Sequence, residues 1–496
     1  MRQFSKRMDT AYDRVPYPTA TYTQTHVRRL AAIARLFGVN APDVRTSRVL
    51  EIGCGEGANL ISMAVDLPDS QFVGIDVSET AIARANEMAA HAGVENVTFR
   101  HLDVAELIGR PGECDYVIAH GVFSWVPRDV QDKMLDLCER VLAPTGIAYI
   151  SYNTYPGWHV REMMAEMMRF HTSGTEDPET AVNEGLGLVL AVGRALGEDN
   201  PYAKAILVEM ERVARRNKVV TFHDDLSPEM KPLLLSEFLK RARSRGLQFM
   251  AEADYTTMVY DDLPQEARSA LEEIRDDAPR REQYLDFFKL RKIRETLLCR
   301  ADLTVLPEAS SGAFDVLYFG VPLMPVRPPD YTNEDPAEFV GQNNMAVTVA
   351  QPLVKAAIAT LCEAWPSRLR FTEILEKAEA KLLLPEPNGT VMLSELILKM
   401  YGAGLMEVDT HPWSYPAAVT ERPAVSKLAR FQAKAGARVT SLRHQSVDLD
   451  DEAARRLVTL LDGKRDKAAL IADSGLDPEM VDAFLTKLLS LSLLIA

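Results

Sequence analysis

The segment Val49–Asn59 constrains the fold of this 496-residue chain more than any other. Its pattern predicts a β-strand, then a turn with three alternating glycines (Gly53, Gly55 and Gly57), then the start of a helix. Glycines suit such a turn because a Cβ would clash with a close ligand or forbid the required dihedral angles. The segment therefore favours a nucleotide-binding α/β sheet over the alternative, a plain strand-to-helix turn.

The hydrophobic pattern from Arg48 to Tyr152 extends this prediction to a whole sheet. Short β-branched or apolar runs alternate with helical stretches, as in a parallel sheet that helices cover on both faces. The predicted strands are 48–53, 71–76, 97–102, 115–120 and 146–152. The predicted helices are 58–66, 79–91 and 130–142. Right-handed crossovers would join units of this length into a doubly wound sheet.

Three acidic residues narrow the choice of ligand. Asp76 ends the second predicted strand, at about the spacing expected of a carboxylate that binds ribose hydroxyls, although it could instead cap a helix. The glycines also fit the dinucleotide pattern, so the ribose alone does not identify the cofactor. Glu51 suits the amino-acid end of S-adenosylmethionine or organises the turn, whereas its charge would serve a pyrophosphate poorly. Asp103 follows the third strand, where it can hydrogen-bond an adenine amino group.

Taken in order, Glu51–Gly57, Asp76 and Leu102–Val104 resemble the class I S-adenosylmethionine-dependent methyltransferases. This resemblance covers about residues 46–152. It implies S-adenosylmethionine as cofactor, with S-adenosylhomocysteine as product. The expected cofactor-binding residues are Glu51, Gly53, Gly55, Gly57, Asn59, Asp76, Val77, Asp103, Val104 and His120.

Further segments resemble one family within that class, the bacterial methyltransferases that carry a methyltransferase regulatory domain. This family includes the rickettsial-type protein lysine methyltransferases of outer-membrane proteins. The segments that carry the resemblance are Tyr12-Asp13, Pro16-Tyr17, 119–127, 151–159, 222–225, 245–252, 282–288 and 297–299, with the tail from Asp450 resembling the winged-helix region. Nothing specific to the family is matched near 333–344 or 173–215.

The expected fold is a doubly wound, Rossmann-like class I methyltransferase sheet with a helical regulatory insert and C-terminal winged-helix-like α+β modules. Proline and glycine breaks and the repeated pattern of three helices and a short strand suggest the boundaries. The expected parts are an N-terminal lid and helix (1–45), the S-adenosylmethionine-binding core (46–172), a helical regulatory region that completes the sheet (173–305), a linker (306–336) and two winged-helix-like modules (337–410 and 411–496).

Aromatic residues are the natural choice for the reaction itself. Methyl transfer from a sulfonium is an in-line displacement, so the protein mainly aligns donor and acceptor and excludes water. Each ring face stabilises a sulfonium or a developing ammonium by ~0.5–2 kcal/mol. The predicted catalytic residues are Tyr17, His120, Trp125 and Tyr152, and the predicted substrate-binding residues are Tyr12, Tyr155 and Trp158. The alternatives are that the two tryptophans simply pack in the core, and that His120 hydrogen-bonds the methionine end of the cofactor instead of acting as a base.

The N-terminal tyrosines lie in a segment that contains Pro16 and Pro18. Because proline fixes φ and restricts the residue before it, residues 12–22 are predicted to be stiff and extended instead of helical. The segment precedes the first strand closely enough to act as a lid over the carboxyl edge of the sheet.

Composition excludes several other functions. A formal net charge of −15 repels phosphate backbones, so no nucleic-acid partner is expected. Five scattered cysteines without a C-x-x-C pair indicate reduced thiols in the cytoplasm and no metal site. We expect no export signal and no membrane insertion. Motifs of zinc proteases, serine hydrolases and P-loop kinases are absent from the sequence.

The sequence therefore predicts an S-adenosylmethionine-dependent methyltransferase. By resemblance, the favoured acceptor is a lysine side chain of a protein partner. One alternative is a small-molecule or natural-product acceptor. The other is a non-catalytic protein that senses the cofactor and binds a partner through its C-terminal modules.

Overall fold

The computed structural model describes residues 11–107, 113–197, 199–341, 345–412 and 415–495. The chain forms two compact units, and it passes between them several times. The first unit contains residues 1–21, 47–249 and 263–301, and the second contains 22–46, 250–262 and 302–496.

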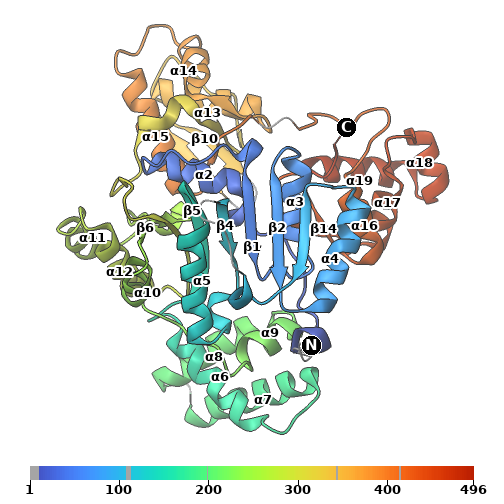
Figure 1. Ribbon diagram of the computed structural model, residues 1–496. Coiled ribbons are helices and arrows are strands. Elements are labelled where there is room, and N and C mark those ends of the chain that lie inside the picture. The colour runs from blue at the N-terminus through green and yellow to red at the C-terminus, as the bar shows by residue number, and fades with distance from the viewer. Residues whose placement is uncertain (1–10, 108–112, 198, 342–344, 413–414, 496) are drawn as a thin grey trace. The chain divides into compact units, whose positions relative to one another are not determined.

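A seven-stranded sheet with the order β3-β2-β1-β4-β5-β7-β6 organises the first unit (Figure 1). Strands β1 to β5 are parallel, and β7 pairs antiparallel with β5. The strands are β1 Arg48–Ile52, β2 Gln71–Asp76, β3 Val97–His101, β4 Cys114–Ala119, β5 Leu142–Asn153, β6 Leu247–Glu252 and β7 Ile293–Arg300. The strand order reverses between β1 and β4, which opens a ligand crevice at the carboxyl ends of these strands.

Three helices alternate with the parallel strands, as the sequence predicts. They are α3 Ala58–Asp66, α4 Glu79–Ala92 and α5 Arg128–Val141. The Ser78 side chain caps α4 by accepting a hydrogen bond from Ala81, and Gly93 in the left-handed region ends this helix. The predicted doubly wound α/β fold is confirmed.

Beyond the carboxyl ends of the strands lies a group of four helices (Figure 1). They are α6 His159–His171, α7 Pro178–Leu196, α8 Pro201–Ala214 and α9 Lys218–Asp225. A buried cluster that includes Met164, Met168, Val189 and Ile206 joins α6, α7 and α8. Three more helices of this unit lie later in the chain: α10 Leu235–Arg243, α11 Gln265–Glu272 and α12 Ala278–Lys289.

Residues 306–336, which we expected to be a linker, are structured within the second unit. They contain η6 Ser311–Val316, β8 Tyr318–Gly320 and β9 Leu323–Pro325. Strand β9 is the edge of a three-stranded sheet with β10 Ala337–Gly341 and β11 Ala346–Val349. The prolines misled the prediction, because proline is tolerated in an edge strand, where a missing N–H leaves no ladder bond unmade.

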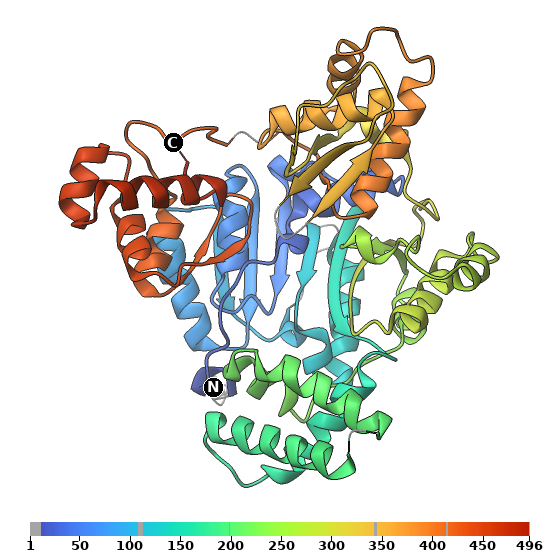
Figure 2. The same cartoon turned by 180° about the vertical axis from the view of Figure 1, so that it is seen from behind.

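The remaining elements of the second unit follow the predicted helical pattern. They are α2 Val27–Leu36, α13 Pro352–Ala364, α14 Phe371–Glu379, α15 Gly389–Gly402, α16 Lys427–Ala435, α17 Glu452–Leu460, α18 Lys467–Ser474 and α19 Pro478–Ser490. Short strands complete two small sheets: β12 Leu369–Arg370 and β13 Glu407–Asp409 flank β8, and β14 Arg438–Thr440 pairs with β15 Ser446–Asp448. Figure 2 shows the C-terminal helices, coloured red, gathered together, and residues 425–494 form a separate hydrophobic cluster.

Two searches of the described residues were negative. None of their helices is long and apolar enough to cross a membrane. Nor do these parts of the chain contain a group of three or more His, Cys, Asp or Glu side chains arranged to hold a metal ion.

Candidate active site

The glycine turn after β1 has the geometry that its sequence predicts. Gly53, Gly55 and Gly57 have φ values of +72°, +52° and +78°, a region that favours glycine. A Cβ on Gly53 would lie 2.3 Å from Cγ2 of Val122, and one on Gly57 would lie 2.5 Å from Cζ of Phe99. Gly55 instead faces open space. The first and third glycines therefore allow close packing, and the middle one leaves room for a ligand.

Asp76 shapes this turn from the end of β2. Its Oδ2 accepts a hydrogen bond from the backbone N–H of Gly55 at 2.9 Å, and its Oδ1 accepts one from Ser78 at 2.9 Å. Burial raises the pKa of the carboxyl group. The carbonyl oxygen of the next residue, Val77, lies 3.0 Å from Nε2 of His101. Asp76 thus supports the loop as well as lying at the crevice edge.

Glu51 is a buried carboxyl group beneath the turn, only 3% exposed. Asn59 donates from Nδ2 to Oε1 of Glu51 at 2.7 Å, which fixes one oxygen. The other oxygen, Oε2, has no hydrogen-bond partner among the described residues. Burial raises the pKa of Glu51 to about 8, and the charge of Asp76 adds to the effect. A buried carboxylate oxygen without a partner fits the ammonium group of an amino-acid ligand.

Asp103 begins the short turn η3 Val104–Glu106 after β3. Its Oδ1 accepts a hydrogen bond from the backbone of Ala105 at 2.8 Å. Val104 is buried, while Asp103 itself is half-buried. The side chain caps this turn in the structure, and its position at a strand end agrees with the predicted place beside the crevice.

His120 and Gly121 follow β4. Nδ1 of His120 lies 2.8 Å from the hydroxyl oxygen of Tyr149. Burial lowers the pKa of His120 to about 4, so its imidazole is neutral at pH 7. Gly121 was missed by the sequence analysis: its φ is +68°, and a Cβ there would meet nothing within 4 Å. Its place directly after a strand was the available signal, because it resembles that of Gly55.

Two of the predicted site residues pack in the interior instead. The Tyr152 ring stacks on Phe238 with centroids 4.3 Å apart, and its hydroxyl lies 3.2 Å from that of Thr296. Trp158 is 4% exposed and donates from Nε1 to Sδ of Met230 at 3.0 Å. The alternation of side chains along β5 turns Tyr152 toward a face of the sheet, away from its carboxyl edge. These placements do not support catalytic or substrate contacts for the two rings.

Tyr155 remains half-buried just past the end of β5. Its hydroxyl donates to Oε2 of Glu162 at 2.7 Å, and its ring stacks on His159 with centroids 4.2 Å apart. Burial and the negative charges of Glu162, Glu166 and Glu237 raise the pKa of Tyr155. Tyr155 therefore lies in an acidic environment.

The N-terminal segment begins with a short helix, α1 Ala11–Arg14, which corrects the prediction that Tyr12 is in extended chain. The Tyr12 ring stacks on His223 of α9, with centroids 4.6 Å apart and planes 7° from parallel. Burial, together with the charges of Asp224 and Asp76, raises the pKa of Tyr12 to about 12. The Tyr17 ring contacts the same imidazole at an angle, with centroids 5.7 Å apart and planes 51° from parallel.

Asp13 ties this segment to the crevice. Its Oδ1 accepts hydrogen bonds from the hydroxyls of Ser78 at 2.6 Å and Thr80 at 2.5 Å, where α4 begins. At the other side, Nε2 of His223 lies 2.7 Å from the carbonyl oxygen of Val15. The segment thus runs between α4 and α9 beyond the end of β2. Asp13 belongs to a segment that carries the family resemblance, but the sequence alone indicates no role for it.

Comparison with known proteins agrees with this geometry. Residues 43–185 match the methyltransferase domain family, residues 217–300 match a predicted methyltransferase regulatory domain, and residues 421–474 match the PKMT C-terminal winged helix domain. An uncharacterized protein of Rickettsia prowazekii is 32% identical over 93% of this chain and 84% of its own length. A second one is 33% identical over 48% of this chain and 96% of its own length.

Among solved structures, PKMT2 from Rickettsia typhi is 27% identical, with a TM-score of 0.87 over 97% of this chain and 100% of its own. The same protein has been solved in complex with AdoHcy (S-adenosylhomocysteine). The fold and the glycine turn define a class I methyltransferase that uses S-adenosylmethionine. Within that class, the chain belongs to the family of methyltransferases that combine a regulatory domain with a PKMT-type winged helix.

Proposed function

We propose that this methyltransferase modifies lysine side chains of a protein. The observation that carries the proposal is the hydrogen bond of the Tyr155 hydroxyl to Glu162, 2.7 Å long, just past the carboxyl end of β5, where Glu166 and Glu237 add negative charge. Negative charge beside a site attracts a cationic side chain. Similarity to PKMT2 over almost the whole chain supports the same acceptor class.

The cofactor supplies an electrophilic methyl group on a sulfonium, and the residues of the crevice would hold it by its polar ends. Oε2 of Glu51 would accept from the α-ammonium group, since that oxygen has no hydrogen-bond partner in the described part of the chain. Asp76 would accept from the ribose hydroxyls, and Asp103 from the adenine amino group. Gly55 and Gly121 leave space for the ligand to approach the backbone.

An amine must lose its proton before it attacks a methyl group. His120, with a pKa of about 4, is too weak a base to take a proton from a lysine ammonium. We therefore assign His120 to hydrogen bonding at the cofactor. The lysine ammonium gives its proton to solvent before the site closes. The ring faces of Trp125 and Tyr17 would stabilise the cationic groups by ~0.5–2 kcal/mol each. All five cysteines are free, which agrees with a reducing compartment such as the cytoplasm.

The test is to incubate the enzyme and S-adenosylmethionine carrying a radiolabelled methyl group with a lysate, then separate the products by size. Label is expected in the protein fraction, and acid hydrolysis should release it as methyl-lysine. The matched control is Gly55→Trp, which fills the open space at the glycine turn and should abolish labelling. Label confined to small molecules, or released as a methylated amino acid other than lysine, would overturn the proposed acceptor.

A further inference from the structure

A loop after β4 carries the predicted catalytic tryptophan. This loop, Phe123–Val126, contains η4 Phe123–Trp125. Phe123 and Ser124 are buried in it, whereas Trp125 is half-buried. Ser124 is held from two sides: its Oγ accepts from the backbone N–H of Asn153 at 2.8 Å, and its carbonyl oxygen accepts from Lys231 at 3.0 Å.

Gln131 of α5 holds the two ends of the same loop. Its Nε2 donates to the carbonyl oxygen of Phe123 at 2.7 Å and to that of Val126 at 3.4 Å. Gln131 is only 2% exposed, so water does not replace these bonds. The loop keeps both bonds only while the NH₂ end of the amide faces it.

Arg241 of α10 determines which way that amide faces. Its guanidinium donates from Nη1 to Oε1 of Gln131 at 2.7 Å. A guanidinium has no acceptor atom, so the amide must turn its oxygen toward Arg241 and its nitrogen toward the loop. The same guanidinium lies 5.5 Å from the centroid of the Phe123 ring. Arg241 therefore acts on the loop both directly and through Gln131.

The rest of the guanidinium is anchored to α5, which fixes its plane. Its Nε and Nη2 donate to Oδ1 of Asp132 at 3.1 and 2.9 Å, and Nη2 also donates to the carbonyl oxygen of Arg128 at 3.4 Å. Three acceptors in different directions need the planar fork of arginine, which a lysine ammonium does not provide.

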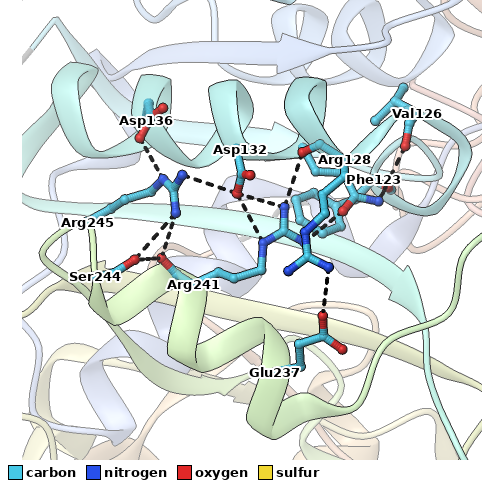
Figure 3. A network of polar contacts seen from close by, with 10 residues as sticks. Phe123, Val126, Arg128, Asp132, Asp136, Glu237, Arg241, Ser244 and Arg245 are labelled. Atoms are coloured by element: carbon cyan, nitrogen blue, oxygen red, sulfur yellow. Dashed lines mark hydrogen bonds and ion pairs between the residues drawn. The ribbon is translucent and has the colours of Figure 1, made fainter.

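Arg245, one turn further on, joins the same part of the chain to α5 without touching the loop. It pairs with Asp136 at 2.6 Å and with Asp132 at 3.1 Å. Figure 3 shows the two arginines side by side, with only Arg241 reaching toward Phe123 and Val126. Arg245 thus joins α5 to the chain that follows α10. It offers a matched control for the effect of Arg241 on the loop.

We propose that Arg241 is a positioning residue through which the regulatory domain sets the place of Trp125 in the methyltransferase domain. Arg241 lies in the part matched to the regulatory domain, and Gln131 lies in the part matched to the methyltransferase domain. The inference rests on the proposed function, in which the Trp125 ring faces the methyl-transfer site. Small displacements of a reacting or supporting group slow a displacement reaction strongly, so a loose loop lowers turnover.

The experiment compares Arg241→Lys, Gln131→Glu and Arg245→Met in the full chain. Gln131→Glu keeps an acceptor for Arg241 but loses both donors to the loop. We expect Arg241→Lys and Gln131→Glu to lower the kcat of methyl transfer about tenfold, while affinity for S-adenosylhomocysteine changes less than about twofold. Arg245→Met should keep kcat within about twofold.

Fluorine NMR of chains labelled with 5-fluorotryptophan reads the loop directly and needs no acceptor. Four resonances are expected, one for each tryptophan, and Trp125→Phe identifies that of Trp125. This resonance should shift or broaden in Arg241→Lys and Gln131→Glu but not in Arg245→Met. An unchanged resonance in Arg241→Lys, or equal changes in all three variants, would overturn the proposal. If wild-type enzyme labels no protein, the proposed function fails, and the NMR comparison still decides the role of Arg241.

Discussion

At the scale of single residues, Glu51 makes a specific prediction about pH. Its pKa is about 8 in the protein without ligand, so the carboxyl group is mostly protonated at pH 7. An ammonium group beside Oε2 would lower that pKa, and binding would then release a proton. Proton release on binding means that affinity rises with pH, by up to about tenfold per unit below the pKa of the free protein.

Titration calorimetry with S-adenosylhomocysteine between pH 6 and 7.5 checks this prediction. The range stays below that in which an α-ammonium group itself loses its proton. Paired buffers of different ionisation enthalpy count the proton released. The Glu51→Gln variant should bind more weakly and without this pH dependence. A pH-independent affinity in the wild type would show that Oε2 does not receive the ammonium group.

The residues of the crevice differ in how well the sequence revealed them. Glu51, Gly55 and Asp76 could be placed at one turn because their positions depend on local spacing along one strand–turn–helix unit. The packing of Tyr152 and Trp158 could not be predicted, because the direction of a side chain near a strand end depends on contacts with distant residues such as Phe238 and Met230. Gly121 lacked a motif, so its place after β4 was a weak signal, and the open space in front of it became evident only in the structure.

At the scale of elements, the N-terminal segment is predicted to matter more for turnover than for folding. Stacking of Tyr12 on His223 and the bonds of Asp13 to Ser78 and Thr80 hold the segment beyond the end of β2. We expect Tyr12→Ala combined with Asp13→Ala to lower methyl transfer at least about tenfold, since an open crevice admits water. The melting temperature should change by only a few degrees, because the contacts involved cover little apolar core.

Tyr12→Phe is the matched control, since it keeps the ring and removes only the hydroxyl. Activity and thermal melting are measured for each variant. Full activity in the double variant would remove Tyr12 from the site. A large loss of melting temperature would instead make the segment part of the folded core.

The elements themselves were predictable where hydrophobic periodicity was regular. The bounds of α3, α4 and β2 agree with the predicted ranges to within one residue. Strand β5 starts at Leu142, four residues earlier than predicted. The prediction started the strand too late because the proline between Ala143 and Thr145 usually signals a break. The short helix α1 was missed because the prediction of extended chain was based on the prolines of this segment, and these begin only after the helix, at Pro16.

At the scale of the whole molecule, the sequence did not reveal that the chain passes between the two units several times. All expected parts were continuous in sequence, whereas the second unit takes residues 22–46 and 250–262 as well as 302–496. Periodicity predicts a helix over 25–37, observed as α2 at 27–36, but does not say what it packs against. In the structure, the carbonyl oxygens of Leu36 and Phe37 accept hydrogen bonds from Ser310 and Leu306, which are far along the chain.

This arrangement predicts which fragments fold alone. Residues 421–496 enclose a hydrophobic cluster of their own, which includes Val439, Leu457, Leu470 and Leu485, and at this size a single core can suffice. We expect this fragment to show helical circular dichroism and a cooperative melt. Leu457→Ala should abolish that melt, since such a substitution costs about 2–5 kcal/mol.

A fragment of residues 302–412 lacks α2, whose buried face belongs to the same unit. This fragment should be unfolded or aggregated until residues 22–46 are joined to it. A cooperative melt of 302–412 alone, or none for 421–496, would contradict this division of the core.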